Sequence, residues 1–294
     1  MSDTEDNKLI KAIKDKGKTM EAEMSFFDHL EALRWHLIRA SIAILVFTIL
    51  AFYFYDFVFD TIIMGPMRPD FFTYRMLCKV GDMLGRPGLC IHSIPGKIIN
   101  TEMAGQFTLT INSCLIAGIT MGIPYLLFEI WRFVRPALLD NERKSASGFV
   151  FYASALFILG ILFGYYVVTP LSVSFLAGYQ VSKIIENTFT IDSYLSSVAT
   201  LTLASGIVFQ LPILVYILSN LGVLTSKVMR AGRRYAVVAI LVIAAVITPT
   251  PDMLTMTVVS IPLFVLYEVG IVVAGAVEKR KLKKERDELI GHAQ

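Results

Sequence analysis

Six long runs of apolar residues set the first limit on how this chain can fold. A helix that crosses the hydrocarbon core of a bilayer needs about 20 predominantly apolar residues, whereas the apolar residues of a soluble domain recur in alternating or amphipathic patterns. Because 55% of its residues are hydrophobic, the chain is predicted to be an all-α, polytopic membrane protein with six transmembrane helices. The runs lie at about 37–55, 106–130, 148–170, 194–220, 235–249 and 254–276.

Two details of these runs predict irregular spans. The fifth run, Tyr235–Thr248, is short for a full crossing, so its helix would tilt little or thin the bilayer locally. The second and fourth runs carry Pro124 and Pro212 in mid-span. Proline removes a helix hydrogen bond, which predicts a bent helix in both places.

Lysine and arginine are divided unevenly between the two sides of the membrane, and their distribution predicts the orientation of the chain. The richer side holds Lys8, Lys11, Lys14, Lys16, Lys18, Arg34, Arg39, Arg132, Arg135, Arg143, Lys144, Lys227, Arg230, Arg233, Arg234, Lys279, Arg280, Lys281, Lys283, Lys284 and Arg286. The poorer side holds Arg68, Arg75, Lys79, Arg86, Lys97 and Lys183. Both termini are therefore predicted to be cytosolic.

This orientation divides the chain into three parts. Residues 1–24 are a polar cytosolic tail, residues 25–277 a membrane domain with an external loop at 56–105, and residues 278–294 a basic cytosolic tail. We expect the basic tail to be solvated or to lie on anionic lipid, and we expect no nucleic-acid partner.

A compact polar loop, Phe133–Lys144, lies on the predicted cytosolic side and reads FVRPALLDNERK. It places Glu142 beside Arg143 and Lys144, although topology requires no carboxylate there. A carboxylate can accept a partner's guanidinium in a planar, two-bond geometry that lysine does not reproduce. The alternative is that Glu142 offsets its basic neighbours or caps the next helix.

The three cysteines have different surroundings. Cys114 lies inside the second predicted span and is expected to serve packing. Cys78 and Cys90 both fall in the external loop, where an oxidising compartment would permit a disulfide. Their spacing leaves open whether they pair.

Polar residues at membrane depth are costly and each needs an explanation. Interfacial solvation is the simpler interpretation for Glu129 and Asp252, which lie at the ends of runs, whereas Glu268 lies well inside the last run. Gln210 lies deep in the fourth run, next to Pro212. Its amide must find hydrogen-bond partners within the bundle or on another protein's helix.

No catalytic constellation emerges, and the chain is not predicted to be an enzyme. The four histidines (His29, His36, His92 and His292) all fall outside the predicted spans. Ser205, in the segment Leu203–Gly206, resembles an intramembrane nucleophile but lacks a histidine partner. No metal site and no cofactor are predicted.

Five segments together resemble the TatC family, the core of the twin-arginine protein translocase. They are HLEALRWHLIR (His29–Arg39), the loop FVRPALLDNERK, FQLPIL (Phe209–Leu214), ITPTPD (Ile247–Asp252) and IPLFVLYEVG (Ile261–Gly270). The resemblance covers about residues 25–277 in the expected order. It implies a receptor in the bacterial inner membrane that binds the paired arginines of signal peptides on its cytosolic face.

The resemblance also implies roles for individual residues. Phe133, Glu142 and the adjacent Arg143 belong to the recognition loop, and Arg34 matches the family's pre-helix arginine. Gln210 stands where the family often has a polar residue that meets a partner's helix, and Asp252 matches the outer-turn aspartate.

Two positions depart from the family pattern. The usual pre-helix glutamate is Ala32 here, with Glu31 one place earlier, and a glutamine of some members is Met256. Glu31 is therefore expected to take over part of the signal-peptide site. The alternative is that Glu31 is solvated or pairs with Arg34.

The family resemblance further implies partners and an energy source. TatA- and TatB-like single-span proteins, self-association and the proton-motive force would together move folded proteins across the membrane. The rival hypothesis is a small ion-coupled secondary transporter, but the chain shows no inverted repeat or paired set of broken helices.

Overall fold

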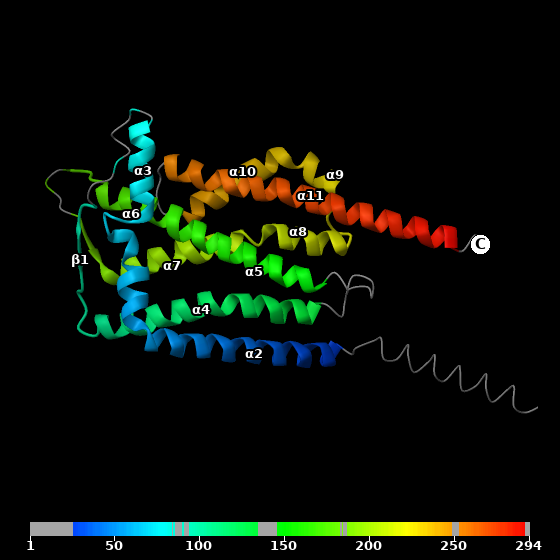
Figure 1. Ribbon diagram of the computed structural model, residues 1–294, viewed down its shortest axis with the longest axis horizontal. Coiled ribbons are helices and arrows are strands. Elements are labelled where there is room, and N and C mark those ends of the chain that lie inside the picture. Colours follow the sequence, from blue (N-terminus) through cyan, green and yellow to red (C-terminus); the bar gives the residue numbers. More distant parts are fainter. Residues whose placement is uncertain are drawn as a thin grey trace, which may run out of the picture.

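The computed structural model describes residues 26–83, 85, 90, 94–134, 146–182, 184, 187–248 and 253–291. Within these ranges the protein is a bundle of helices that run along its long axis (Figure 1). The N-terminal tail 1–24 lies outside the described residues.

The longest helices follow the predicted apolar runs. They are α2 (Phe26–Tyr53), α4 (Gly105–Val134), α5 (Ala146–Phe163), α7 (Ile191–Val208), α8 (Leu211–Asn220), α10 (Arg233–Ile247) and α11 (Met253–Gly291). Shorter helical segments are η1 (Phe57–Ile63), η2 (Gly65–Met67), α3 (Phe72–Met83), η6 (Gly164–Val168), α6 (Thr169–Gly178) and α9 (Ser226–Ala231).

In the part of the chain that the structure describes, five helical stretches are long and apolar enough to cross a membrane. They are Leu33–Tyr53, Gly105–Phe133, Val150–Gly178, Ile191–Asn220 and Thr255–Lys283. The fifth predicted span, which is not among these stretches, corresponds to α10, which has 15 residues. At 1.5 Å per residue this helix is about 22 Å long, shorter than a hydrocarbon core of about 30 Å.

The purely all-α prediction missed a small sheet. Strands β1 (Lys97–Ile99) and β2 (Thr188–Thr190) pair in parallel, with Ile98 opposite Phe189. Each strand has only three residues and lies between helices. Strands this short leave no apolar run of their own, so the sequence pattern did not reveal them.

The start of α2 and the end of α11 lie at the same end of the bundle, which we call the terminal end (Figure 1). Helices α3 and α6 and strand β1 lie at the other end, which we call the loop end, where α3 stands across the bundle axis (Figure 1).

Helices α2 and α4 lie side by side and antiparallel, along a contact that we call the α2–α4 seam (Figure 1). A Cβ atom on Gly118 would lie 2.7 Å from the backbone nitrogen of Thr48. One on Gly122 would lie 3.2 Å from the Cα atom of Ile44. These glycines form a GxxxG motif, the spacing that lets two membrane helices approach closely.

A second close seam joins α5 and η6 to α7. A Cβ atom on Gly160 would lie 2.8 Å from the Cα atom of Gly206, and one on Gly164 would lie 2.9 Å from that of Thr202. Because lipid tails are as apolar as leucine, such backbone proximity and packing, not apolar burial, hold membrane helices together.

The two mid-span prolines behave differently. The fourth span breaks at Phe209 and Gln210, immediately before Pro212 at the start of α8. Helix α4, by contrast, continues without interruption past Pro124. Proline fits the first turn of a helix, where no hydrogen bond from its nitrogen is required.

The loop end is tied together by buried tyrosines and a disulfide. Tyr74 on α3 donates hydrogen bonds to the carbonyls of Pro66 (2.8 Å) and Pro170 (3.1 Å). Burial raises the pKa of Tyr74, which keeps its hydroxyl protonated as a donor. A disulfide joins Cys78 on α3 to Cys90. Closing a loop of this size stabilises a fold by about 3 kcal/mol in the chain-entropy model.

Candidate functional site

The residues that the sequence assigned to one recognition loop are only partly within the described structure. Phe133 is the penultimate residue of α4 at the terminal end and is half-buried. Glu142 and Arg143 fall in residues 135–145 and lie outside the described residues, as does Asp252. The geometry of the site therefore rests on the ends of α2 and α4.

Glu31 and Arg34 lie in the second and third turns of α2, and both side chains are exposed. Across the described ranges, neither residue forms an ion pair or a hydrogen bond, so the alternative pairing of Glu31 with Arg34 is not seen. The Glu31 carboxylate is thus open to a ligand at this end of α2.

Glu129 was expected to be solvated at the membrane interface, and that interpretation is wrong. Its exposed fraction is 1%, and its carboxylate is shared between two helices. Tyr125, one turn earlier on α4, donates a hydrogen bond to Oε1 over 2.8 Å. His36 of α2 contacts Oε2 through Nδ1. Burial of a carboxylate without such partners would be costly.

His36 was placed outside all spans, but it lies inside the apolar stretch Leu33–Tyr53. Its ring also makes an edge-to-face contact with the ring of Phe133, with 6.0 Å between the centroids. The ring of His36 therefore contacts two residues of α4, Glu129 and Phe133, that are four positions apart and share one helix face.

Sequence reasoning missed this cluster, although a signal was present. The GxxxG motif Gly118–Gly122 marks one face of α4 as a helix-packing face. Residues of an antiparallel partner then pair so that their numbers sum to a nearly constant value, as Thr48 with Gly118 and Ile44 with Gly122 do. Extending the same register brings position 36 beside position 129.

Gln210 takes the N-cap position of α8 without a side-chain capping hydrogen bond, and one half of its amide is bonded within the bundle. Nε2 donates a hydrogen bond to the carbonyl of Ala153 on α5 over 3.0 Å. Oε1 is buried and accepts no hydrogen bond within the described chain. The amide was predicted to need hydrogen-bond partners. Helix α5 supplies one for Nε2, and Oε1 stays without one in the described chain.

The remaining intramembrane carboxylate, Glu268 on α11, pairs with Arg233 at the start of α10. The distance between Arg233 Nη2 and Glu268 Oε2 is 2.7 Å. Arg233 is half exposed, so the charge of Glu268 is neutralised near the terminal end of the bundle instead of standing alone.

The surroundings of Ser205 fit a role in helix packing. Its hydroxyl donates to the carbonyl of Leu201 over 2.8 Å, one turn earlier on α7, and the residue packs against Gly160 and Gly164. Among the described residues, no group of three His, Cys, Asp or Glu side chains lies close enough together to hold a metal ion.

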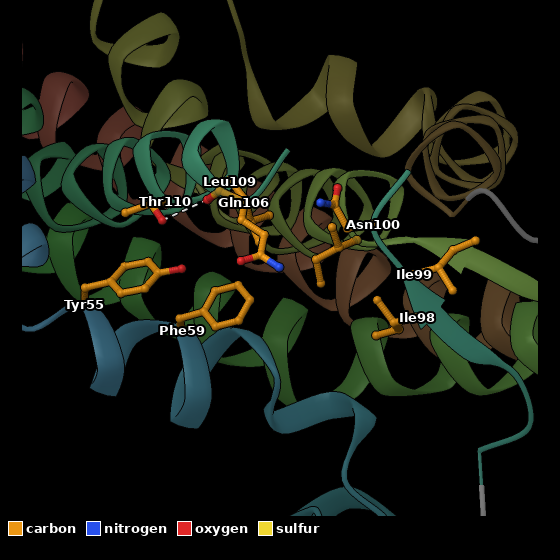
Figure 2. A pocket seen from close by; sticks show the side chains of 9 residues that line it. Tyr55, Phe59, Ile98, Ile99, Asn100, Gln106, Leu109 and Thr110 are labelled. Carbon is orange, nitrogen blue, oxygen red and sulfur yellow. Dashed lines mark hydrogen bonds between the residues drawn. The ribbon is translucent and has the colours of Figure 1, made fainter. Parts of the chain in front are cut away.

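Two of the pockets lined by described residues show what lies away from the terminal end. One, of about 460 Å³, is lined by the η1 region, strand β1 and the start of α4, with Gln106 pointing toward Tyr55 and Phe59 (Figure 2). The other, of about 470 Å³, is mostly apolar and lies between η1, α4, α5 and α7, with Ser113 and Tyr165 in its wall. Neither is lined by a charged side chain.

A protein-family comparison matches residues 28–262 to the model of the Sec-independent protein translocase protein TatC. A TatC protein of Blattabacterium sp. subsp. Periplaneta americana is 35% identical over 266 residues, covering 90% of this chain and 100% of the relative. That of Deinococcus radiodurans is 33% identical, covering 86% of both proteins.

The fold is also similar to solved structures. A crystal structure of the twin arginine translocase receptor TatC superposes with a TM-score of 0.63 at 31% sequence identity. The alignment covers 85% of this chain and 99% of the crystallised one. A second crystal structure, of the receptor in the detergent DDM, gives a TM-score of 0.64.

Proposed function

The chain belongs to the TatC family of Sec-independent protein translocase proteins, and from this premise we propose that it is the signal-peptide receptor of a twin-arginine translocase. The single observation that carries the proposal is the family match over residues 28–262, together with the likeness to crystal structures of the receptor. Its cargo would be folded proteins whose signal peptides carry paired arginines, and the proton-motive force would drive their export.

We propose that the terminal end of the bundle is cytosolic and that α10 is a sixth span. Exposed basic residues at this end support the orientation, among them Arg34, Arg39, Arg132, Lys227 and Arg230. Because the start of α2 and the end of α11 lie at the same end, an even number of crossings is required. Five long helices alone would place these ends on opposite sides of the membrane.

The division of the chain follows from this orientation. Residues 25–277 would form the membrane domain of a multi-pass protein of the bacterial inner membrane, with residues 56–105 outside the cell membrane. The tails 1–24 and 278–294 would be cytosolic, and the basic C-terminal tail would contact solvent or anionic lipid.

The twin-arginine site would lie where α4 leads into the segment 135–145. Glu142, next to Arg143, would accept one guanidinium, and the exposed Glu31 beside Arg34 on α2 would offer a second carboxylate. Phe133 supports this location because it is the last half-buried aromatic residue of α4 before that segment. A sheltered, bidentate pair whose loss costs roughly 2–5 kcal/mol would select arginine over lysine.

Partners would complete the translocase. We propose that TatA- and TatB-like single-span proteins and further copies of this chain assemble with it. Gln210 would meet a partner's helix through Oε1, the acceptor that lacks a hydrogen bond in the described chain. Since that atom is buried, neighbouring side chains would have to move when the partner binds. Asp252 would belong to the outer turn before α11.

The secondary-transporter hypothesis loses its main support in the structure. Glu129 is bonded to His36 and Tyr125, Glu268 to Arg233, and Gln210 to α5. These polar groups lie in three separate places and do not form one site near mid-membrane, as a substrate site between repeats would.

Binding of a twin-arginine peptide tests the proposed function. Purified full-length protein should bind a fluorescent twin-arginine signal peptide at least tenfold more tightly than its twin-lysine version. Glu142→Gln should remove most of this preference, because a neutral amide accepts only weakly from a guanidinium. Asp140→Asn makes the same charge change two positions away and is the matched control. Equal binding of both peptides by the unmodified protein would reject the proposed function.

A further inference from the structure

The α2–α4 seam ends, at the terminal end, in a polar cluster formed by His36, Tyr125 and Glu129. Farther along the seam, Gly118 meets Thr48 and Gly122 meets Ile44 at backbone distance. The cluster continues the same antiparallel register toward the end of α4 at Val134.

Both oxygens of the Glu129 carboxylate are engaged, one by Tyr125 of its own helix and one by His36 of the other. A buried carboxylate loses most of its hydration, so its hydrogen bonds to protein donors are strong and have a defined direction. The contact between α2 and α4 is therefore directional at this end, whereas the glycine contacts farther along are only steric.

The same imidazole also contacts Phe133. Its edge-to-face geometry, with an interplanar angle of 69° and a centroid distance of 6.0 Å, is a preferred one for aromatic pairs. Rotation of the His36 ring would break the contact with Glu129 and with Phe133 together. By fixing the His36 ring, the carboxylate of Glu129 thus limits the positions that the Phe133 side chain can take.

We propose that the His36–Glu129 contact is a positioning element for the twin-arginine site, fixing Phe133 of α4 relative to the first turns of α2. This inference rests on the proposed receptor function. Glu129 itself does not touch the peptide, because it is 1% exposed. It acts through His36 and Phe133, and it holds the end of α4 at one distance from Arg34, two residues before His36 on α2.

Two arginines lie close to the cluster. Arg39 of α2 acts electrostatically on both Glu129 and Tyr125, and Arg132 of α4 acts on Tyr125. Both guanidinium groups are exposed. A cationic peptide at this end therefore meets positive charge from both helices, and its acceptors must be exposed carboxylates, because Glu129 is buried with both oxygens engaged.

Four single variants of the full-length protein (His36→Phe, His36→Asn, Glu129→Gln and Tyr74→Phe) and one double variant separate positioning from general stability. His36→Phe keeps a ring against Phe133 but removes the donor to Glu129. His36→Asn places an amide donor where Nδ1 lies and removes the ring. Tyr74→Phe is the matched control, because it removes a buried hydroxyl with two hydrogen bonds at the loop end, far from the proposed site.

The measurements are the dissociation constants for twin-arginine and twin-lysine peptides and the thermal midpoint of each protein. His36→Phe should weaken twin-arginine binding about tenfold, a common size for effects transmitted through packed networks. His36→Asn should weaken it by a similar factor, because the amide keeps a donor for Glu129 but leaves Phe133 without its ring contact. Glu129→Gln combined with His36→Phe should be no worse than His36→Phe alone. Tyr74→Phe should lower the midpoint without changing either affinity.

Each outcome bears on the proposal. Unchanged binding by His36→Phe would overturn it, and so would unchanged binding by His36→Asn, which would show that the ring contact with Phe133 is not needed. If the double variant loses affinity by the product of the two single losses, His36 and Glu129 act independently, and the proposal is also overturned. If the unmodified protein does not distinguish the two peptides, the proposed function itself fails, and that result is separate from any effect of His36.

Discussion

Gln210 is held by only one half of its side-chain amide. Nε2 reaches the carbonyl of Ala153, while Oε1 is buried without a donor in the described chain. Intramembrane hydrogen bonds contribute on average only about 0.6 kcal/mol, so the residue has little value for the stability of the isolated chain. The free acceptor Oε1 would contribute more to assembly, by accepting a hydrogen bond from a donor on a second helix.

Gln210→Leu should therefore weaken assembly with single-span partners and leave the chain folded. The thermal midpoint should fall by only a few degrees, since about 0.6 kcal/mol is lost, whereas co-purification of partners should fall several-fold. Gln106→Leu, at an exposed glutamine near the loop end, is the control. Intact co-purification from Gln210→Leu membranes would contradict the proposed contact.

Glu31 is an exposed carboxylate of α2, one position before Ala32, and we propose it as a second acceptor of the twin-arginine site. Glu31→Ala should reduce export of a twin-arginine cargo several-fold, because the carboxylate has no partner in the described chain that would withhold it from a peptide. Export is measured by the appearance of folded cargo outside the cytosol. The comparison variant is Glu102→Ala, an exposed carboxylate near the loop end. Near-normal export by Glu31→Ala would mean that Glu142 acts without this second acceptor.

At the scale of elements, the α2–α4 seam is close because Gly118 and Gly122 have no side chain. A Cβ atom on Gly118 would meet the backbone of Thr48, which cannot rotate away as a side chain can. The two helices would have to separate, and the His36–Glu129 contact at the end of the seam would be displaced with them.

Gly118→Ala is expected to destabilise the protein by about 1–3 kcal/mol, the usual cost of overpacking a close contact. Thermal unfolding of the detergent-solubilised protein measures it. Gly178→Ala serves as the control, because a Cβ atom there meets nothing within 4 Å. A midpoint for Gly118→Ala equal to that of Gly178→Ala would show that the seam is looser than the structure indicates.

At the scale of the whole molecule, the number of crossings depends on α10. Its 15 residues span about 22 Å, so it can cross only where the bilayer is thin or the ends of the helix are drawn inward. Arg233 and Arg234 begin the helix, and Arg233 pairs with Glu268 of α11. This pair lowers the cost of bringing a charged helix start close to the hydrocarbon.

Cysteine labelling decides whether α10 crosses. In a background without native cysteines, Lys227→Cys before α10 should react with a membrane-impermeant maleimide only after cells are permeabilised. Met253→Cys, after α10, should react in intact cells. Both positions are exposed, so access to the thiol depends only on the side of the membrane. Labelling of both from the same side would reduce the protein to five spans.

The sequence by itself determined the features that depend on local composition. Apolar runs predicted the long helices, and Pro212 marked the break before α8. The orientation favoured by the distribution of lysine and arginine stays a prediction. Each of these follows from the cost of placing a residue or a backbone group in hydrocarbon, which is a property of the segment alone.

Only the tertiary structure decided how the segments pair. Glu129 looked like a solvated residue at the end of a run, because nothing within its own segment shows that His36 lies beside it. Gln210 needed a partner, but only the packing of α8 on α5 reveals that Ala153 supplies one. Strands β1 and β2 are more than 80 residues apart in the chain. Each is too short for a sequence pattern to predict that they pair. These contacts depend on the steric fit between distant helices, set here by four glycines that permit backbone approach, and no periodicity within a single run encodes that fit.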